Sequence, residues 1–277
     1  MEIGQGMEIR HATHPSQVAG FDTADLRAHY LVEDLFPAAQ VRLVYSHQDR
    51  TVVGGVAPVE APVRLESADP LRSPYFCSRR EVGVVNVGTS APVRVDGVSH
   101  DLAHGDCLYV GRGARDVVFG PGGCFYLVSA PAHTAYPTTL SRLADVPGTR
   151  LGGAEGSTDR TIYKHVHADG VRSCQLVLGV TVLEPGSMWN TMPCHTHDRR
   201  TEVYLYFDLP SDQRVVHLMG RPDQTRNLIV SDRQAVISPS WSVHCGFGTA
   251  SYAFVWAMAG ENQAFDDMDP VAVTALR

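Results

Sequence analysis

Residues 189–204 read WNTMPCHTHDRRTEVY, and this stretch places two histidines and a glutamate close together. Residues two apart on a β-strand point to the same face, so His195 and His197 present both imidazoles to one side. The polar residues 198–200 can turn the chain, and Glu202 then returns on the next strand. About forty residues later, PSWSVH at 239–244 offers a third histidine, His244. Three imidazoles and one carboxylate suit a divalent ion such as Zn, Fe, Mn, Ni or Co. The alternative is that both histidines are exposed at a hairpin and Glu202 pairs with a neighbouring arginine.

Short runs of Val, Tyr, Phe and Leu, broken by Gly, Pro, Asp and Ser, surround this stretch and predict strands. They lie at 41–46, 51–56, 82–87, 93–95, 107–110, 116–119, 174–183, 201–207, 214–219, 225–230, 234–237 and 252–258. Asp96-Gly97 predicts a type I′ hairpin turn. One helix is predicted over Ala24–Phe36, capped by Thr23 and stopped by Pro37. The Pro- and Gly-rich stretch 131–161 is expected to link two similar halves.

Composition excludes several classes of protein. The 277 residues carry a formal net charge of −7, which argues against a nucleic acid partner and mildly against an anionic membrane. There is no apolar run long enough to span a bilayer and no signal-peptide core at the N-terminus. The six cysteines show no Cys-x-x-Cys pair, so we expect reduced thiols and a cytoplasmic protein. Met1-Glu2-Ile3 recurs from Met7, which suggests a possible second start of translation.

The ligand spacing resembles the two signature motifs of the cupin superfamily, Gly-x5-His-x-His-x(3,4)-Glu-x6-Gly and Gly-x5-Pro-x-Gly-x2-His-x3-Asn. His195, His197 and Glu202 match the first motif, and His244 matches the second, whereas several turn residues differ. The resemblance implies an all-β protein of two tandem cupin (jelly-roll-like) barrels. We expect an N-terminal helical extension (1–40), an N-terminal cupin (41–150) and a C-terminal, metal-binding cupin (151–277).

The first half carries an incomplete copy of the same pattern. Glu81 stands at the position of the motif glutamate, but Pro74, Phe76 and Asp116 occupy the positions of the histidines. Proline and phenylalanine cannot bind a metal. We therefore expect the N-terminal cupin to be metal-free and structural.

Longer strings narrow the resemblance to the 5-keto-4-deoxyuronate isomerase (4-deoxy-L-threo-5-hexosulose-uronate ketol-isomerase) family. These strings are 44–50, 53–55, 189–197, 237–244 and GENQAFDDMD at 260–269, so the likeness covers nearly the whole chain. The resemblance implies a zinc-containing, usually hexameric enzyme. Its members convert the open-chain unsaturated-uronate product of pectin breakdown to 3-deoxy-D-glycero-2,5-hexodiulosonate.

An aldose–ketose shift needs a polarised carbonyl, a base and a carboxylate contact. Glu202 is the proposed proton carrier if it loosens from the metal; the alternatives are Lys164, His165, His167 and Tyr204. The carboxylate of the substrate should meet a guanidinium, for which Arg160, Arg199 and Arg226 are candidates, together with Arg200. Cys194 and Cys245, beside ligand histidines, are interpreted as packing residues. Trp189, Met192 and Trp241 could line the pocket or pack in the core.

Two other functions remain open from the residues. One is another cupin metalloenzyme, either an isomerase of a different uronate or an iron-dependent dioxygenase. The other is a non-catalytic sugar-binding module. Fold alone does not decide among them.

Overall fold

The computed structural model describes residues 6–277, which form two compact units. The N-terminal unit contains the described residues up to Arg10, then Asp34–Val146 and His165–Leu178. The C-terminal unit contains His11–Glu33, Pro147–Lys164 and Gly179–Arg277. Both units are built from strands, so the all-β prediction is confirmed. The domain boundaries at 40 and 150 stay a prediction. A start of translation at Met7 would leave out residues 1–6, and residues 1–5 lie outside the described part of the chain.

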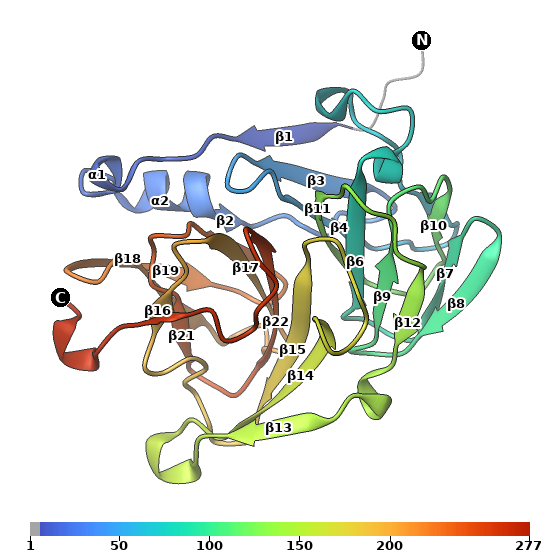
Figure 1. Cartoon of the computed structure of the whole chain (residues 1–277). Helices are drawn as coiled ribbons and strands as arrows, with labels where there is room; N and C mark the ends of the chain where they lie inside the picture. Colours follow the sequence, from blue (N-terminus) through green and yellow to red (C-terminus); the bar gives the residue numbers. More distant parts are fainter. Residues whose placement is uncertain (1–5) are drawn as a thin grey trace. The chain divides into compact units, whose positions relative to one another are not determined.

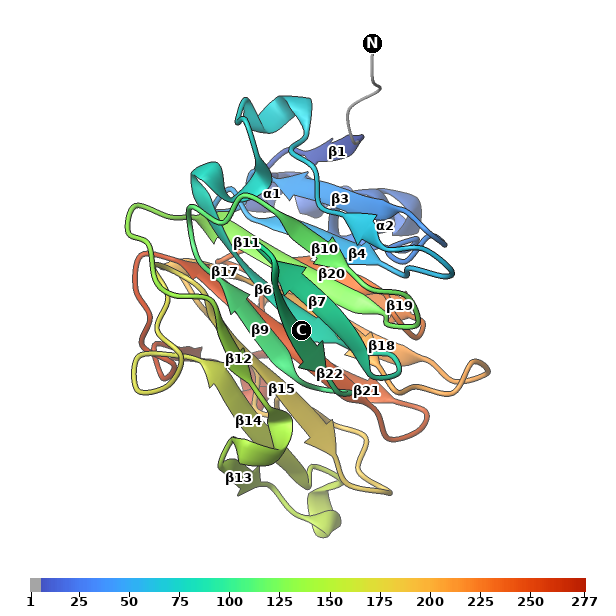
Figure 2. The same ribbon diagram turned by 90° about the vertical axis from the view of Figure 1, so that its right-hand side faces the viewer.

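Two sheets make up the N-terminal unit, and Figure 2 looks onto β10 and β7 with β6 and β9 behind them. The larger sheet has the order β1 (Met7–Arg10), β3 (Val41–Ser46), β4 (Val52–Val56), β11 (Phe125–Pro131), β6 (Arg80–Asn86), β9 (Cys107–Val110) and β12 (Thr139–Ser141). The smaller sheet has the order β5 (Val63–Arg64), β10 (Val117–Phe119), β7 (Ala91–Val95) and β8 (Val98–Leu102). Side chains from both sheets, such as Leu127 and Phe119, form one buried apolar cluster.

The predicted hairpin at Asp96-Gly97 is confirmed. Val95 pairs with Val98, and both central residues have positive φ, 48° at Asp96 and 86° at Gly97. A type I′ turn needs positive φ at both positions, which Asp and Gly tolerate better than most residues. This turn sets the register between β7 and β8.

The C-terminal unit is the second all-β unit (Figure 1). Its large sheet has the order β13 (Gly148–Leu151), β14 (Arg160–Val166), β15 (Val177–Leu183), β22 (Ala253–Gly260), β17 (Arg200–Phe207), β20 (Ala235–Ser238) and β2 (Leu31–Val32). A three-stranded sheet has the order β19 (Gln224–Val230), β18 (Val215–Arg221) and β21 (Cys245–Gly248). The short strands β16 (His195–Thr196) and β23 (Asp269–Pro270) pair with each other.

The N-terminal helix is shorter than predicted. Helix α2 spans Thr23–Tyr30, and its cap is Asp22, whose carboxylate accepts from the Asp25 backbone N–H in a capping box. The predicted extension to Phe36 and the cap at Thr23 are therefore wrong. Leu31 and Val32 instead form β2 and pair with β20, because edge pairing and burial outweigh their helical spacing. A short helix, α1 (Pro15–Val18), precedes α2.

The stretch 131–161 contains more regular structure than a link between halves. Besides β12, β13 and the start of β14, it includes the 3₁₀ turns η3 (Leu143–Asp145) and η4 (Ala154–Gly156). Further 3₁₀ turns are η1 (Asp69–Leu71), η2 (Phe76–Ser78) and η5 (Val273–Ala275). The Pro and Gly residues of 131–161 lie within or between these short elements rather than in one long loop. Among residues 6–277, no helix combines the length and the apolar character needed to cross a membrane.

Glu81, the motif glutamate of the first half, is fully buried in the N-terminal unit. Its carboxylate accepts from the Tyr109 hydroxyl at 2.6 Å and from the backbone N–H groups of Cys174, Gln175 and Leu176 at 2.7, 2.7 and 2.8 Å. Phe76, at a histidine position of the motif, lies in the apolar core. Glu81 thus holds the backbone of residues 174–176 in place through three N–H donors, and the Tyr109 hydroxyl is its fourth donor.

Candidate metal centre

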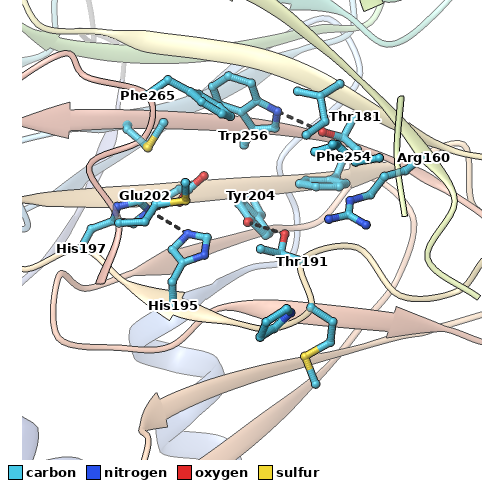
Figure 3. A pocket seen from close by; sticks show the side chains of 16 residues that line it. Arg160, Thr181, Thr191, His195, His197, Glu202, Tyr204, Phe254, Trp256 and Phe265 are labelled. Carbon is cyan, nitrogen blue, oxygen red and sulfur yellow. Dashed lines mark hydrogen bonds and ion pairs between the residues drawn. The ribbon is translucent and has the colours of Figure 1, made fainter. Parts of the chain in front are cut away.

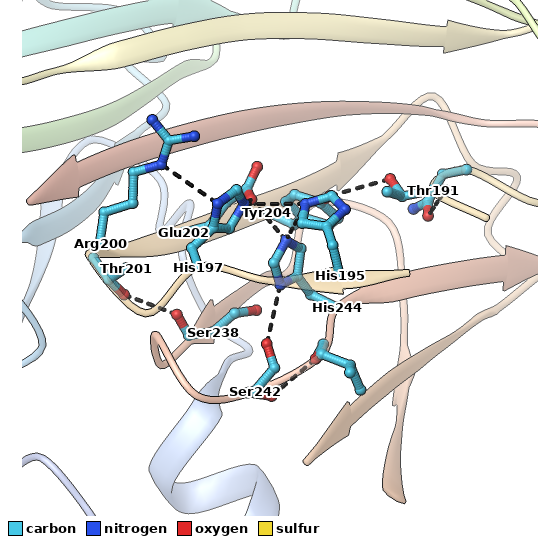
Figure 4. A network of polar contacts seen from close by, with 12 residues as sticks. Thr191, His195, His197, Arg200, Thr201, Glu202, Tyr204, Ser238, Ser242 and His244 are labelled. Atoms are coloured by element: carbon cyan, nitrogen blue, oxygen red, sulfur yellow. Dashed lines mark hydrogen bonds and ion pairs between the residues drawn. The ribbon is translucent and has the colours of Figure 1, made fainter. Parts of the chain in front are cut away.

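Three short segments of the C-terminal unit bring the four predicted ligands together (Figure 4). His195 lies on β16, His197 directly follows that strand, and Glu202 lies on β17. His244 immediately precedes β21 and forms an antiparallel bridge with His195. The strand alternation predicted from the sequence therefore places both imidazoles of the His-x-His pair on one side, and the bridge adds the third.

One ligand atom from each of the four side chains lies within 4.8 Å of the others. The Nε2 atom of His195 is 3.1 Å from both His197 Nε2 and His244 Nε2. The Oε2 atom of Glu202 is 2.8 Å from the Nε2 atoms of His197 and His244. All four side chains are buried, so water competes little for these atoms.

Backbone carbonyls set the tautomers of two of the imidazoles. His197 Nδ1 is 2.8 Å from the Asp267 carbonyl oxygen, and His244 Nδ1 is 3.2 Å from that of Ser242. A carbonyl oxygen only accepts, so each Nδ1–H donates outward and each ring points its Nε2 atom inward. The Nε2 atoms face one another and the carboxylate of Glu202, an arrangement that would suit a cation between them. The donor set fits a divalent metal, and the outer carbonyls are the partners that orient ligand histidines.

The electrostatics favour the metal-binding protonation states of His195 and Glu202. Burial lowers the pKa of His195 to about 3, with further lowering by His244 and His197, so the ring is neutral at pH 7. Burial by itself raises the pKa of Glu202, but the charge and hydrogen bonds of His244 and His197 outweigh it. The pKa of Glu202 is therefore well below its usual range, and its side chain is a carboxylate.

The cluster lies in a cavity of about 290 Å³ (Figure 3). Two neighbouring strands supply its floor, because Glu202 and Tyr204 of β17 pair with Met258 and Trp256 of β22. The Trp256 indole N–H donates to Thr181 Oγ1 at 3.1 Å, which holds the ring in place. Phe254, Phe265 and Met268 add further apolar wall. The site is thus a polar cluster in a largely apolar cavity.

The structure separates the candidate arginines. Arg160 lines the cavity on the side away from the histidines, as Figure 3 shows. Arg199 does not line it; its guanidinium pairs with Asp267 and Asp269. Arg226 donates to the carbonyls of Thr225 and Ala19, also outside the cavity lining. The roles of Arg199 and Arg226 stay predictions, and their positions favour Arg160.

Among the candidate proton carriers, Glu202 and Tyr204 line the cavity. The Tyr204 hydroxyl is 3.2 Å from Thr191 Oγ1, and burial raises the pKa of Tyr204, so it is a neutral phenol. Lys164, His165 and His167 do not line the cavity. The Lys164 ammonium instead lies 3.8 Å from the centre of the Phe265 ring.

The residues beside the ligands mainly pack. Cys194 and Cys245 form a buried cluster with Val243, which supports their interpretation as packing residues, and Trp189 packs against the same cluster. Met192 lines the cavity, whereas Trp241 does not. The aromatic wall from β22 was missed by sequence reasoning, although the i, i+2, i+4 spacing of Phe254, Trp256 and Met258 indicates one shared face.

Fold and site together define a class: an all-β cupin protein whose C-terminal unit holds a buried three-histidine, one-glutamate group that can bind a metal. Solved structures support the fold. An IolB-like protein from Salmonella typhimurium LT2 matches 77% of this chain and 85% of its own, with a TM-score of 0.64 at 15% identity. A variant of Bacillus subtilis oxalate decarboxylase matches 88% and 78%, with a TM-score of 0.58 at 13% identity.

The chain belongs to the KduI/IolB family, whose model matches residues 30–273. Among curated relatives, the 4-deoxy-L-threo-5-hexosulose-uronate ketol-isomerase of Kineococcus radiotolerans is 57% identical over 98% of this chain and 100% of its own length. The protein of the same name from Halalkalibacterium halodurans is 50% identical, and that from Bacillus subtilis 47%, with the same coverage. The resemblance noted from the sequence is confirmed at the level of the family.

Proposed function

We propose that this protein is a metal-dependent ketol-isomerase that converts 4-deoxy-L-threo-5-hexosulose uronate to 3-deoxy-D-glycero-2,5-hexodiulosonate. The observation that carries the proposal is the His195–His197–Glu202–His244 cluster in a cavity that Arg160 also lines. It stands in a chain 57% identical to a protein named for this isomerisation. The cluster supports the chemistry, and the relatives support the substrate.

The isomerisation moves a proton between C2 and C1 while the two oxygens exchange alcohol and carbonyl roles. A divalent metal held by the four ligands would supply a Lewis acid that polarises the carbonyl and acidifies the adjacent hydroxyl. The Glu202 carboxylate, which is ionised at neutral pH, would accept the proton from one carbon and return it to the other once it loosens from the metal. The neutral Tyr204 hydroxyl, near the same floor, can hydrogen-bond an oxygen of the substrate.

The cavity supports one orientation of the open-chain substrate. Its C1–C2 end would lie at the histidine cluster, and its carboxylate would meet the Arg160 guanidinium, which lies on the far side of the cavity and can bind a carboxylate bidentately. The middle of the substrate, including the C4 methylene, then passes the Trp256 and Phe254 rings. An apolar wall suits a deoxygenated carbon, because a hydroxyl there would lose its hydrogen bonds to water.

Three finer features follow from the family resemblance. Zinc is the proposed ion, a homo-hexamer the proposed assembly, and pectin or polyuronate breakdown in the cytoplasm the proposed setting. The six cysteines are all free thiols, in agreement with a reducing compartment.

The test is an isomerase assay on the keto-uronate, with wild type and His244→Ala compared for turnover and bound metal. We expect wild-type turnover that collapses in the variant together with metal binding. Turnover that persists in a metal-free variant would make the metal structural. A metal-loaded wild type without turnover would reject the proposed substrate, and oxygen uptake with bound iron would then identify a dioxygenase.

A further inference from the structure

The segment 261–268, which follows β22, forms part of the cavity wall. Its Phe265 and Met268 side chains line the cavity. Between them, the Asp267 carbonyl accepts the hydrogen bond from His197 Nδ1 at 2.8 Å. One short segment therefore both lines the pocket and orients one of the clustered imidazoles.

Arg200 ties this segment to the cluster. Its Nη1 donates to the Ala264 carbonyl, and its Nη2 donates to the carbonyls of Phe265 and Asp267 at 3.3 and 3.1 Å. Its Nε lies 3.4 Å from His197 Nδ1 (Figure 4). A planar guanidinium with five N–H groups can reach several carbonyls at once, which a lysine ammonium cannot do with the same geometry.

The burial of Arg200 excludes a direct role on the substrate. Its side chain is 1% exposed and does not line the cavity. Burial lowers its pKa, yet a guanidinium keeps its charge at neutral pH. A buried charge is costly unless it is hydrogen-bonded, and the three segment carbonyls provide those bonds. Arg200 and the segment thus stabilise each other.

Gly260 makes the close approach possible. It pairs with Arg200 across β17 and β22, and a Cβ placed on it would lie 2.5 Å from the Arg199 carbonyl oxygen and 2.5 Å from Arg200 Cβ. Any larger residue would push the start of the segment away from Arg200. Gly260 therefore leaves room for the close contact between Arg200 and the segment, and the hydrogen bonds of Arg200 hold that contact.

We propose that Arg200 is a positioning residue that holds segment 261–268 against the metal centre. Through the Asp267 carbonyl it orients His197 for metal binding, and it holds the part of the cavity wall formed by Phe265 and Met268 in place. This inference rests on the proposed metal site, and only its KM readout rests on the proposed substrate.

The experiment compares wild type with Arg200→Lys and Gly260→Ala, the second of which removes no side chain from the contact. Arg221→Lys is the control, because the Arg221 guanidinium pairs with Asp223 at the surface of the same unit. Zn²⁺ affinity is measured by competition with a chromophoric chelator. The visible spectrum of the Co²⁺ form reports ligand geometry, and chymotrypsin cleavage after Phe265 reports release of the segment.

We expect Arg200→Lys and Gly260→Ala to bind Zn²⁺ about 10- to 100-fold more weakly, the range for loss of an outer-shell partner. Their Co²⁺ spectra should change and their cleavage should be faster, while the control stays near wild type. At saturating Zn²⁺, KM for the keto-uronate should rise more than kcat falls. Wild-type Zn²⁺ affinity in both variants, or equal losses in Arg221→Lys, would overturn the proposal. If the metal results hold but wild type does not turn over the keto-uronate, the proposed function fails and this inference stands.

Discussion

Glu81 and Glu202 occupy the glutamate position of the cupin motif in the first and second halves of the chain. We expect Glu81 to stabilise the fold and Glu202 to bind the metal, and substitution by glutamine tests both roles. Glu81→Gln keeps the size of the side chain but replaces one carboxylate oxygen by an NH₂ group, which only donates. In the structure, one oxygen of Glu81 accepts from Tyr109 and Cys174, and the other from Gln175 and Leu176. Whichever way the amide turns, it faces two of these donors with N–H groups.

The magnitude follows from the donors that lose their acceptor. Each buried donor left without a partner costs about 1 to 3 kcal/mol, so two cost about 2 to 6 kcal/mol of the free energy of unfolding. With an m-value of about 2 to 3 kcal/mol/M, the urea midpoint should fall by about 0.7 to 3 M. Metal binding should not change, because all four donors of Glu81 belong to the N-terminal unit.

The assay is urea unfolding followed by far-UV circular dichroism on metal-free protein, with Zn²⁺ affinity measured separately on the folded state. Glu202→Gln is the matched comparison, since it should lose at least about tenfold in Zn²⁺ affinity with a smaller change in midpoint. A Glu81→Gln midpoint equal to that of wild type would refute the hydrogen-bond argument. A loss of Zn²⁺ affinity as large as in Glu202→Gln would refute the division of roles.

Two other predictions concern the pocket and pH. Arg160→Met should raise KM for the keto-uronate about 10- to 150-fold, because it loses about 1.5 to 3 kcal/mol of charged hydrogen bonding. Arg226→Met should leave KM unchanged. The reverse pattern in steady-state kinetics would mean that the substrate carboxylate binds elsewhere. Burial lowers the pKa of His217 in the folded protein to about 3. Below about pH 6.5 the unfolded chain therefore binds a proton at His217 that the folded protein does not, and the free energy of unfolding drops by up to about 1.4 kcal/mol per pH unit. Urea unfolding of metal-free protein between pH 4.5 and 7 should show a shallower pH dependence for His217→Asn, and an unchanged slope would contradict the assignment.

Much of the fold and the metal cluster was predictable from local pattern. The strands at 41–46 and 107–110 begin and end where predicted, because alternation and turn residues are local properties. The His-x-His pair and Glu202 converge because a strand and a short turn place them on one face. His244 was also predicted from the sequence, because the second cupin motif contains a metal-binding histidine. Local periodicity does not show that His244 lies close to the His-x-His pair.

Local pattern failed where neighbours in space outweighed neighbours in sequence. Leu31 and Val32 have helical spacing with Leu26 and Leu35, but pairing with β20 makes them a strand. Pro and Gly residues in 131–161 indicated a loop, yet short strands run between them. Burial and pairing with β20 decided the conformation of Leu31 and Val32. In 131–161 backbone pairing alone did so, of β12 with β9 and of β13 with β14.

The sequence by itself determined the all-β class, the four clustered side chains and the loss of the matching histidines in the first half. Only the tertiary structure decided which arginine faces the cavity, that β22 supplies its apolar wall, and that Arg200 holds a segment rather than a substrate. The physical reason is that sequence periodicity tells which residues share a face of a strand. It does not tell which strand or segment lies opposite that face, and the partners across it set what a buried charge can do.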